Sequence, residues 1–153
     1  MKFKNPLLVV KDIKNSTKFY KEVLGLNVII DFGANVTLTG GVCLQTEDTW
    51  KDFINNSPIL YGNNDAEIYF EEDNFDTFIE KLNTFSTIQY VHQVIEHSWG
   101  QRVVRFYDLD NHIIEVGENL KTVCKRFVDS GMTIKEVAKK MDIPEKFISL
   151  SIK

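Results

Sequence analysis

The pattern of hydrophobic and polar residues along the chain predicts the same group of elements twice. The stretch "LLVVKDIKNSTKFYKEVLGL" begins as an apolar strand, continues through Asp12 and then takes on a helical period. The apolar face of this helix is formed by Ile13, Thr17, Tyr20 and Leu24, with Phe19 and Val23 beside them. Gly25 has the position of a glycine that ends a helix.

A second strand and helix follow in "AEIYFEEDNFDTFIEKL", where Asp73 has the place that Asp12 has in the first copy. The apolar residues that recur at helical spacing there are Phe75, Phe78, Ile79 and Leu82. Three strand-like segments follow each helix, so each half reads β-α-β-β-β. We predict modules at about residues 1–48 and 65–118, joined by a polar linker with one helical turn at Thr49–Ile54.

A different pattern covers residues 119–153, for which we predict a helical appendage. The stretch "LKTVCKRFVDSG" has one apolar face and ends at a glycine. Thr133 and Glu136 have the spacing of a capping box, and Pro144 marks the start of a last short helix. The helix that begins at Thr133 and the one that begins at Pro144 together resemble a helix-turn-helix core. This leaves open the alternative that the chain is a regulator that contacts DNA.

Composition and charge narrow the function classes. Hydrophobic residues make up 43% of the 153 residues and charged residues 26%, as in soluble globular proteins. The apolar stretch near the N-terminus is too short for a signal peptide, and no run approaches a membrane span, so we expect a cytoplasmic protein. Cys43 and Cys124 lie far apart and are expected to be reduced and buried or half-buried. The net charge of −4 argues against a general nucleic-acid role, although residues 120–153 alone carry +4.

The stretch "HSWGQRVVRFYDLDNHIIEVGE" predicts a hairpin with a carboxylate, Glu115, between Ile114 and Val116. Alternation puts Arg102 on one face of its strand, and Arg105 and Tyr107 on the other. An arginine is expected to pair with Glu115 or to bind an anionic substrate, and the sequence does not say which. The four candidate substrate-binding residues are Trp99, Arg102, Arg105 and Tyr107. The turn residue His112 is expected to be exposed.

Together, the tandem repeat, "FYKEVLGL" and "YDLDNHIIEV" resemble the vicinal oxygen chelate superfamily, which contains glyoxalases, bleomycin-resistance proteins and extradiol dioxygenases. The resemblance covers residues 1–118. It implies an α+β fold in which two βαβββ modules form a curled sheet around a cavity. In the metal-dependent members, four residues in the strands hold a divalent ion.

The resemblance carries these four metal-binding positions onto Asn5, Gln45, Glu67 and Glu115, a set without histidine. Transition metals favour imidazole ligands, whereas carboxylate and amide oxygens suit harder ions. The only cofactor that the resemblance implies is a divalent metal such as Mn, Mg, Ni or Zn.

Two main hypotheses follow. In the first, the chain binds a small organic molecule in the cavity between the modules, without a standard metal site. In the second, it is a metal-dependent lyase or dioxygenase, in which Glu67 and Glu115 hold the ion and Glu115 moves protons. Both expect a small-molecule ligand or substrate, a homodimer, and neither nucleic acid nor membrane as partner.

Overall fold

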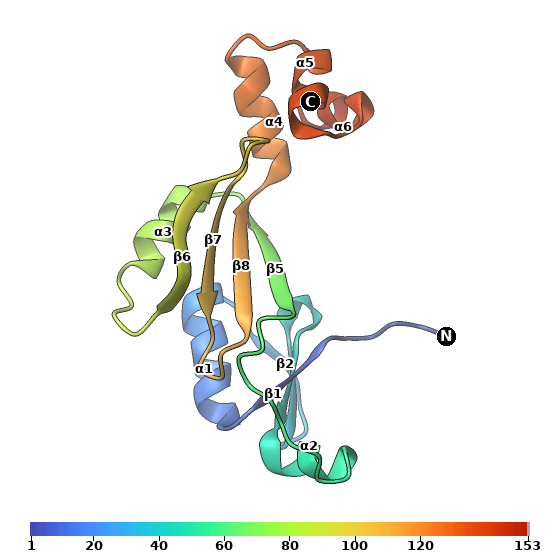
Figure 1. The fold of residues 1–153 in the computed structure, drawn as a ribbon, viewed down its shortest axis with the longest axis vertical. Helices are drawn as coiled ribbons and strands as arrows, with labels where there is room; N and C mark the ends of the chain where they lie inside the picture. Colours follow the sequence, from blue (N-terminus) through green and yellow to red (C-terminus); the bar gives the residue numbers. More distant parts are fainter. Residues whose placement is uncertain (153) are drawn as a thin grey trace. The chain divides into compact units, whose positions relative to one another are not determined.

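The computed structural model describes residues 1–152, and these form two four-stranded sheets and six α-helices (Figure 1). The elements of the first half are β1 (Leu7–Val10), α1 (Ile13–Leu24), β2 (Val28–Asp31), β3 (Asn35–Leu38), the short 3-10 helix Thr39–Gly41, β4 (Cys43–Thr46) and α2 (Glu47–Phe53). Those of the second half are β5 (Glu67–Glu72), α3 (Phe75–Leu82), β6 (Gln89–Glu96), β7 (Arg102–Tyr107) and β8 (Ile113–Glu118). The helices α4 (Leu120–Asp129), α5 (Ile134–Met141) and α6 (Glu145–Ser151) follow. The predicted α+β fold of two βαβββ modules with C-terminal helices is confirmed.

The first sheet has the strand order β1-β4-β3-β2. β1 pairs with β4 in parallel, so that Val9 lies beside Gln45, and the other neighbours are antiparallel. Asp12 caps α1, because its side chain accepts the backbone N–H groups of Lys14 and Asn15 at 3.0 Å. Gly25 ends the helix in the left-handed conformation, as its position predicts. The core of this half is formed by Val10, Tyr20, Val23, Val36, Leu38 and Leu44.

The second sheet repeats this order as β5-β8-β7-β6. The helical spacing of α3 buries Phe75, Phe78 and Leu82, the apolar side predicted from the sequence. Both central strands are buried: β7 contributes Val103, Val104 and Phe106 to the core, and β8 contributes Ile114 and Val116. Glu115, flanked by these last two, is buried as well.

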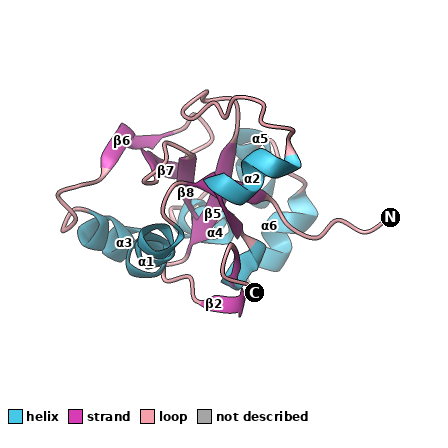
Figure 2. Ribbon diagram, turned by 90° about the horizontal axis from the view of Figure 1, so that it is seen from below, coloured by secondary structure: helices cyan, strands magenta, loops and turns pink. Residues whose placement is uncertain are grey.

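The linker between the modules contains more helix than the sequence indicated. The prediction was one turn at Thr49–Ile54, whereas α2 spans Glu47–Phe53 and follows β4 directly. Glu47 and Asp48 in its first turn and Lys51 in its last suit the helix dipole, which explains the earlier start. The chain from α2 to β5 then has no regular secondary structure (Figure 2).

The C-terminal helices have a hydrophobic cluster of their own. Its buried members are Val123, Cys124, Val137, Met141 and Ile148. The predicted capping box of α5 is confirmed, and Pro144 immediately precedes α6. Cys43 and Cys124 are both buried and free, as predicted.

By its internal packing the chain divides into two compact units. The first unit contains residues 1–67 and the β7–β8 turn at 107–113, and the second contains residues 68–106 and the chain from 114 onward. The boundary predicted at residue 118 stays a prediction. None of the helices in residues 1–152 has the length and apolar character needed to cross a membrane.

Candidate functional site

Glu115 and Arg105 form an ion pair on neighbouring strands of the second unit. Only 6% of Glu115 is exposed, and the guanidinium of Arg105 lies against its Oε2. Arg105 Nη1 is also 3.2 Å from Nε2 of the half-buried His92. A buried carboxylate needs such a partner, because leaving water costs a lone charge several kcal/mol. The structure thus shows which arginine meets Glu115, a point that the sequence left open.

The other residues predicted to bind substrate all have partners within the chain. Arg102 pairs with both Asp76 and Glu118, and these hydrogen bonds raise its pKa, with Glu118 making the larger contribution. The indole N–H of Trp99 donates to Gln101 at 3.2 Å. The hydroxyl of Tyr107 donates to Asn64 at 3.0 Å. A role of Trp99, Arg102 and Tyr107 in binding stays a prediction.

Three of the four residues carried over as metal ligands have hydrogen-bond or ion-pair partners within the chain, and the role of all four as metal ligands stays a prediction. Asn5 donates its amide to the backbone oxygen of Gly41 at 2.8 Å. Gln45 is buried, with its oxygen accepting from Asn35 at 2.8 Å and its amide donating to Thr49. Glu67 is exposed, and Arg105 already supplies a positive charge to Glu115. Within residues 1–152, no three His, Cys, Asp or Glu side chains gather as a metal-holding group.

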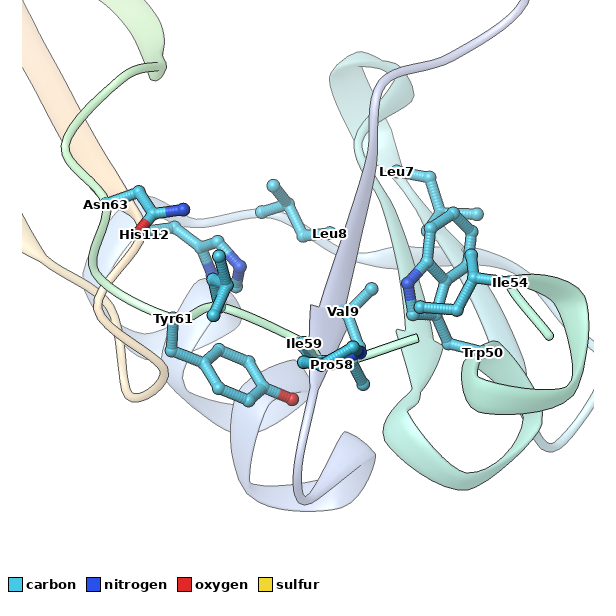
Figure 3. A pocket seen from close by; sticks show the side chains of 11 residues that line it. Leu7, Leu8, Val9, Trp50, Ile54, Pro58, Ile59, Tyr61, Asn63 and His112 are labelled. Carbon is cyan, nitrogen blue, oxygen red and sulfur yellow. The ribbon is translucent and has the colours of Figure 1, made fainter. Parts of the chain in front are cut away.

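A cavity of about 370 Å³ lies in the first unit, beside strand β1 (Figure 3). Its wall is formed by strand β1, helix α2, the segment 58–63 and the β7–β8 turn. The residues that line it are Leu7, Leu8, Val9, Trp50, Ile54, Pro58, Ile59, Leu60, Tyr61, Asn63 and His112. Most are apolar, and a few polar groups stand among them, which is the usual composition of a site for a small organic molecule.

One hydrogen bond holds the segment 58–63 to helix α2 and so shapes the cavity, and an ion pair within the helix supports it. The hydroxyl of Tyr61 donates to Glu47 Oε2 at 2.9 Å. The ammonium group of Lys51, one helical turn after Glu47, pairs with its other oxygen. Partial burial and the Glu47 carboxylate together raise the pKa of Tyr61 far above its ordinary range. Tyr61 therefore remains a neutral hydroxyl.

His112 contributes the other polar wall, and a buried carboxylate orients it. Its Nδ1 is 2.8 Å from Asp108 Oδ2, and Asp108 is only 6% exposed. The same oxygen accepts the hydroxyl of Tyr20 at 2.8 Å, while Oδ1 accepts the backbone N–H groups of Asp110 and His112 at 2.9 Å. Burial and the neighbouring Asp108 raise the pKa of Tyr20.

Lys11 and Asp110 complete this end of the first unit. Lys11 lies 4.5 Å above the ring of Tyr61, within the range of a cation–π contact. Its ammonium group is 3.9 Å from Asp110, and its backbone N–H donates to the same carboxylate at 3.3 Å. Burial raises the pKa of Asp110 despite these contacts. The polar end of the cavity is therefore neither strongly cationic nor strongly anionic.

Sequence reasoning missed this cavity and gave the wrong environment for His112. The ring of His112 is half-buried and packs edge-on against Tyr61, with centroids 6.3 Å apart, whereas exposure was expected. The signals were the aromatic and aliphatic residues in the linker, Trp50, Ile54, Ile59 and Tyr61, which a purely solvated connection would not carry. The distance along the chain to His112 gave no hint that they would meet.

Comparisons with known proteins agree with this architecture. The family model described as a glyoxalase-like domain matches residues 3–121. The chain therefore belongs to the glyoxalase-like family, within the vicinal oxygen chelate superfamily. No curated protein matches the chain.

Solved structures extend the comparison. A protein of unknown function from Agrobacterium tumefaciens is 34% identical, with a TM-score of 0.70 over 78% of this chain and 94% of that one. A glyoxalase/bleomycin resistance protein/dioxygenase from Nocardioides is 16% identical, with a TM-score of 0.62 over 77% and 83%. A family enzyme from Burkholderia phytofirmans is 13% identical, with a TM-score of 0.62 over 75% and 96%. At such low identity these last two support the fold alone.

Proposed function

We propose that the chain binds a small, largely apolar organic molecule in the cavity of the first unit, without the help of a metal ion. The observation that carries the proposal is the cavity itself, with its apolar wall and its few oriented polar groups. Its volume of about 370 Å³ lies within the usual range for small-molecule sites.

The charge arrangement in the second unit supports the metal-free part of the proposal. A divalent ion at Glu115 would have to displace Arg105 from a buried carboxylate and leave a guanidinium without its partner. Gln45, in turn, would lose two hydrogen bonds. The alternative of a metal-dependent lyase or dioxygenase therefore has less support, and the shared cavity expected between the modules stays a prediction.

A variant that fills the cavity tests the proposal. Val9 lines the cavity, and Val9→Phe adds bulk without removing a hydrogen bond (Figure 3). A matched control is Val91→Phe, at an exposed position of β6 in the second unit. The readout is calorimetric titration with a panel of apolar one- and two-ring fragments. We expect the wild type and the control to bind members of the panel, and Val9→Phe to lose at least about tenfold in affinity. Equal binding by all three proteins would overturn the proposal.

A further inference from the structure

The cavity of the first unit has two chemically different ends (Figure 3). Leu7, Trp50 and Ile54 form an aliphatic and indole wall at one end. Tyr61, Asn63 and His112 lie at the other end, and Val9 lies between the two ends. An occupant that matches both ends has an apolar ring system and a polar group at one edge.

The contacts of His112 leave one ring nitrogen for an occupant. Asp108 accepts hydrogen bonds from Tyr20 and from two backbone N–H groups, so it also acts as the acceptor toward His112 Nδ1. Nδ1 therefore carries the hydrogen. Nothing within the described chain, residues 1–152, forms a hydrogen bond with Nε2.

A hydroxyl group fits this nitrogen in either charge state of the imidazole. Neutral His112 presents Nε2 as an acceptor, and protonated His112 presents an N–H donor. A hydroxyl can donate in the first case and accept in the second. A phenol or alcohol can therefore form a hydrogen bond with this nitrogen in both cases.

The surrounding charges favour a neutral occupant over a carboxylate or an amine. Glu47 bonds Tyr61, Asp108 bonds His112, and Asp110 lies beside Lys11, so three carboxylates lie behind the residues of this end and would repel an anionic group. Lys11 lies over the Tyr61 ring and Lys51 pairs with Glu47, which opposes a cationic group.

The volume sets the size of the ring system. A cavity of about 150 Å³ holds a benzene molecule. The cavity here, at about 370 Å³, is large enough for two fused rings with a substituent.

Building on the proposed function, we propose that the cavity recognises hydroxylated aromatic compounds of about two rings, with the hydroxyl bonded to Nε2 of His112. The rings lie against Val9, Trp50 and Ile54. Asp108 acts as a positioning residue, because it holds the imidazole in the orientation and tautomer that leave Nε2 facing the ligand.

The test compares two probes of nearly equal shape, 2-naphthol and 2-fluoronaphthalene, by calorimetric titration of the full chain. A site built to bond a hydroxyl rejects the analogue that lacks it. We expect the wild type to bind 2-naphthol about tenfold more tightly than 2-fluoronaphthalene. In His112→Phe, which keeps a ring but removes both nitrogens, we expect the two affinities to become equal within about threefold.

Two controls separate the possible failures. His97→Phe makes the same substitution in the second unit, and it should keep the preference for 2-naphthol. Val9→Phe should lower the affinity for both probes if they occupy the cavity. Equal affinity of the wild type for both probes, with both lost in Val9→Phe, would overturn the ligand class and leave the proposed function standing. Failure of the wild type to bind either probe would overturn the ligand class, and failure with the whole fragment panel would overturn the proposed function.

Discussion

At the scale of single residues, buried carboxylates organise both units of the protein. Asp108 accepts hydrogen bonds from a tyrosine, a histidine and two backbone groups, and Glu115 is neutralised by Arg105. Glu118, 2% exposed, is paired by Arg102 and Arg126. Each carboxylate thus has the partners that a charged group needs away from water.

The Glu115–Arg105 pair predicts a characteristic double-mutant result. Arg105→Leu leaves the carboxylate buried without its partner and should lower the free energy of unfolding by about 2–4 kcal/mol, measured by urea denaturation. Adding Glu115→Gln should recover part of this loss, because no buried charge then remains. If the two substitutions simply add, the pair is not the source of the cost.

The contacts of Glu47 beside the cavity predict that the fold loses stability in acid. The hydrogen bond from Lys51, followed by that from Tyr61, lowers the pKa of Glu47 below its ordinary value of 4.5. The folded state therefore binds this proton more weakly than the unfolded state does, so ionised Glu47 stabilises the fold above pH 4.5. That contribution is lost as the pH falls through the folded pKa.

The measurement is the unfolding temperature as a function of pH between about 5 and 3. Glu47→Gln should lose less stability over this interval than the wild type does. Glu80→Gln, at an exposed position of α3, is the control and should follow the wild type. A Glu47→Gln profile parallel to the wild type would contradict the assigned role.

Residue environments were the least predictable level from sequence. Alternation assigned Arg105 and Glu115 to faces of their strands, but the sequence could not fix how the two strands are aligned, so it could not say which arginine meets Glu115. His112 was expected to be exposed because it lies in a turn. It is half-buried because the turn packs in the first unit against Tyr61, through a contact that no local pattern encodes.

At the scale of elements, periodicity predicted most of the fold. Helices α1, α3 and α5 lie where the helical spacing of apolar residues put them, and caps such as Asp12 and the Thr133 capping box mark their starts. Helix α2 was predicted too short, because the acidic first turn and the Glu47–Lys51 pair that favour its earlier start do not show in a pattern of apolar residues. Trp50 lines the cavity and is not part of a repeated apolar face.

The turn before β7 lies against helix α4. We therefore expect a larger residue in this turn to lower the stability of the protein. A Cβ on Gly100 would lie 2.2 Å from the Phe127 ring of α4, and Gly100 has φ +91°. Gly131 has a similar φ of +98° but open space around it. Gly100→Ala should therefore destabilise the protein clearly more than Gly131→Ala, since both share the backbone strain and only the first has the clash. Equal losses of unfolding free energy in the two variants, measured by urea denaturation, would show that the Phe127 ring moves aside without destabilising the protein.

At the scale of the whole molecule, the family match ends near the start of the C-terminal helices. It covers residues 3–121, whereas α4 to α6 extend to residue 151. These helices carry the basic end of a chain whose net charge is −4. Their role as a docked appendage or as a DNA-contacting module stays a prediction.

The expected homodimer can be tested at the edge of the first sheet. The edge strand β2 exposes Val28, Ile29 and Ile30, with Phe32 beyond its end. An apolar, exposed edge favours association with another chain, and we propose a second copy as the partner. Light scattering of the wild type should give twice the chain mass of 17.7 kDa. The Ile29→Lys variant should give the mass of a single chain. A wild type that runs as a monomer would contradict the proposal.

The two tryptophans provide the most direct test of the central claim, because there is one in each unit. Trp50 lines the cavity of the first unit. Trp99 lies in the second unit and is one of the residues that the sequence predicted to bind substrate. The measurement is a titration of ¹⁵N-labelled protein with 2-naphthol, followed through the two indole N–H resonances. If the cavity is the binding site, the Trp50 resonance shifts and that of Trp99 stays in place. A shift of the Trp99 resonance alone would put the ligand in the second unit and contradict the account.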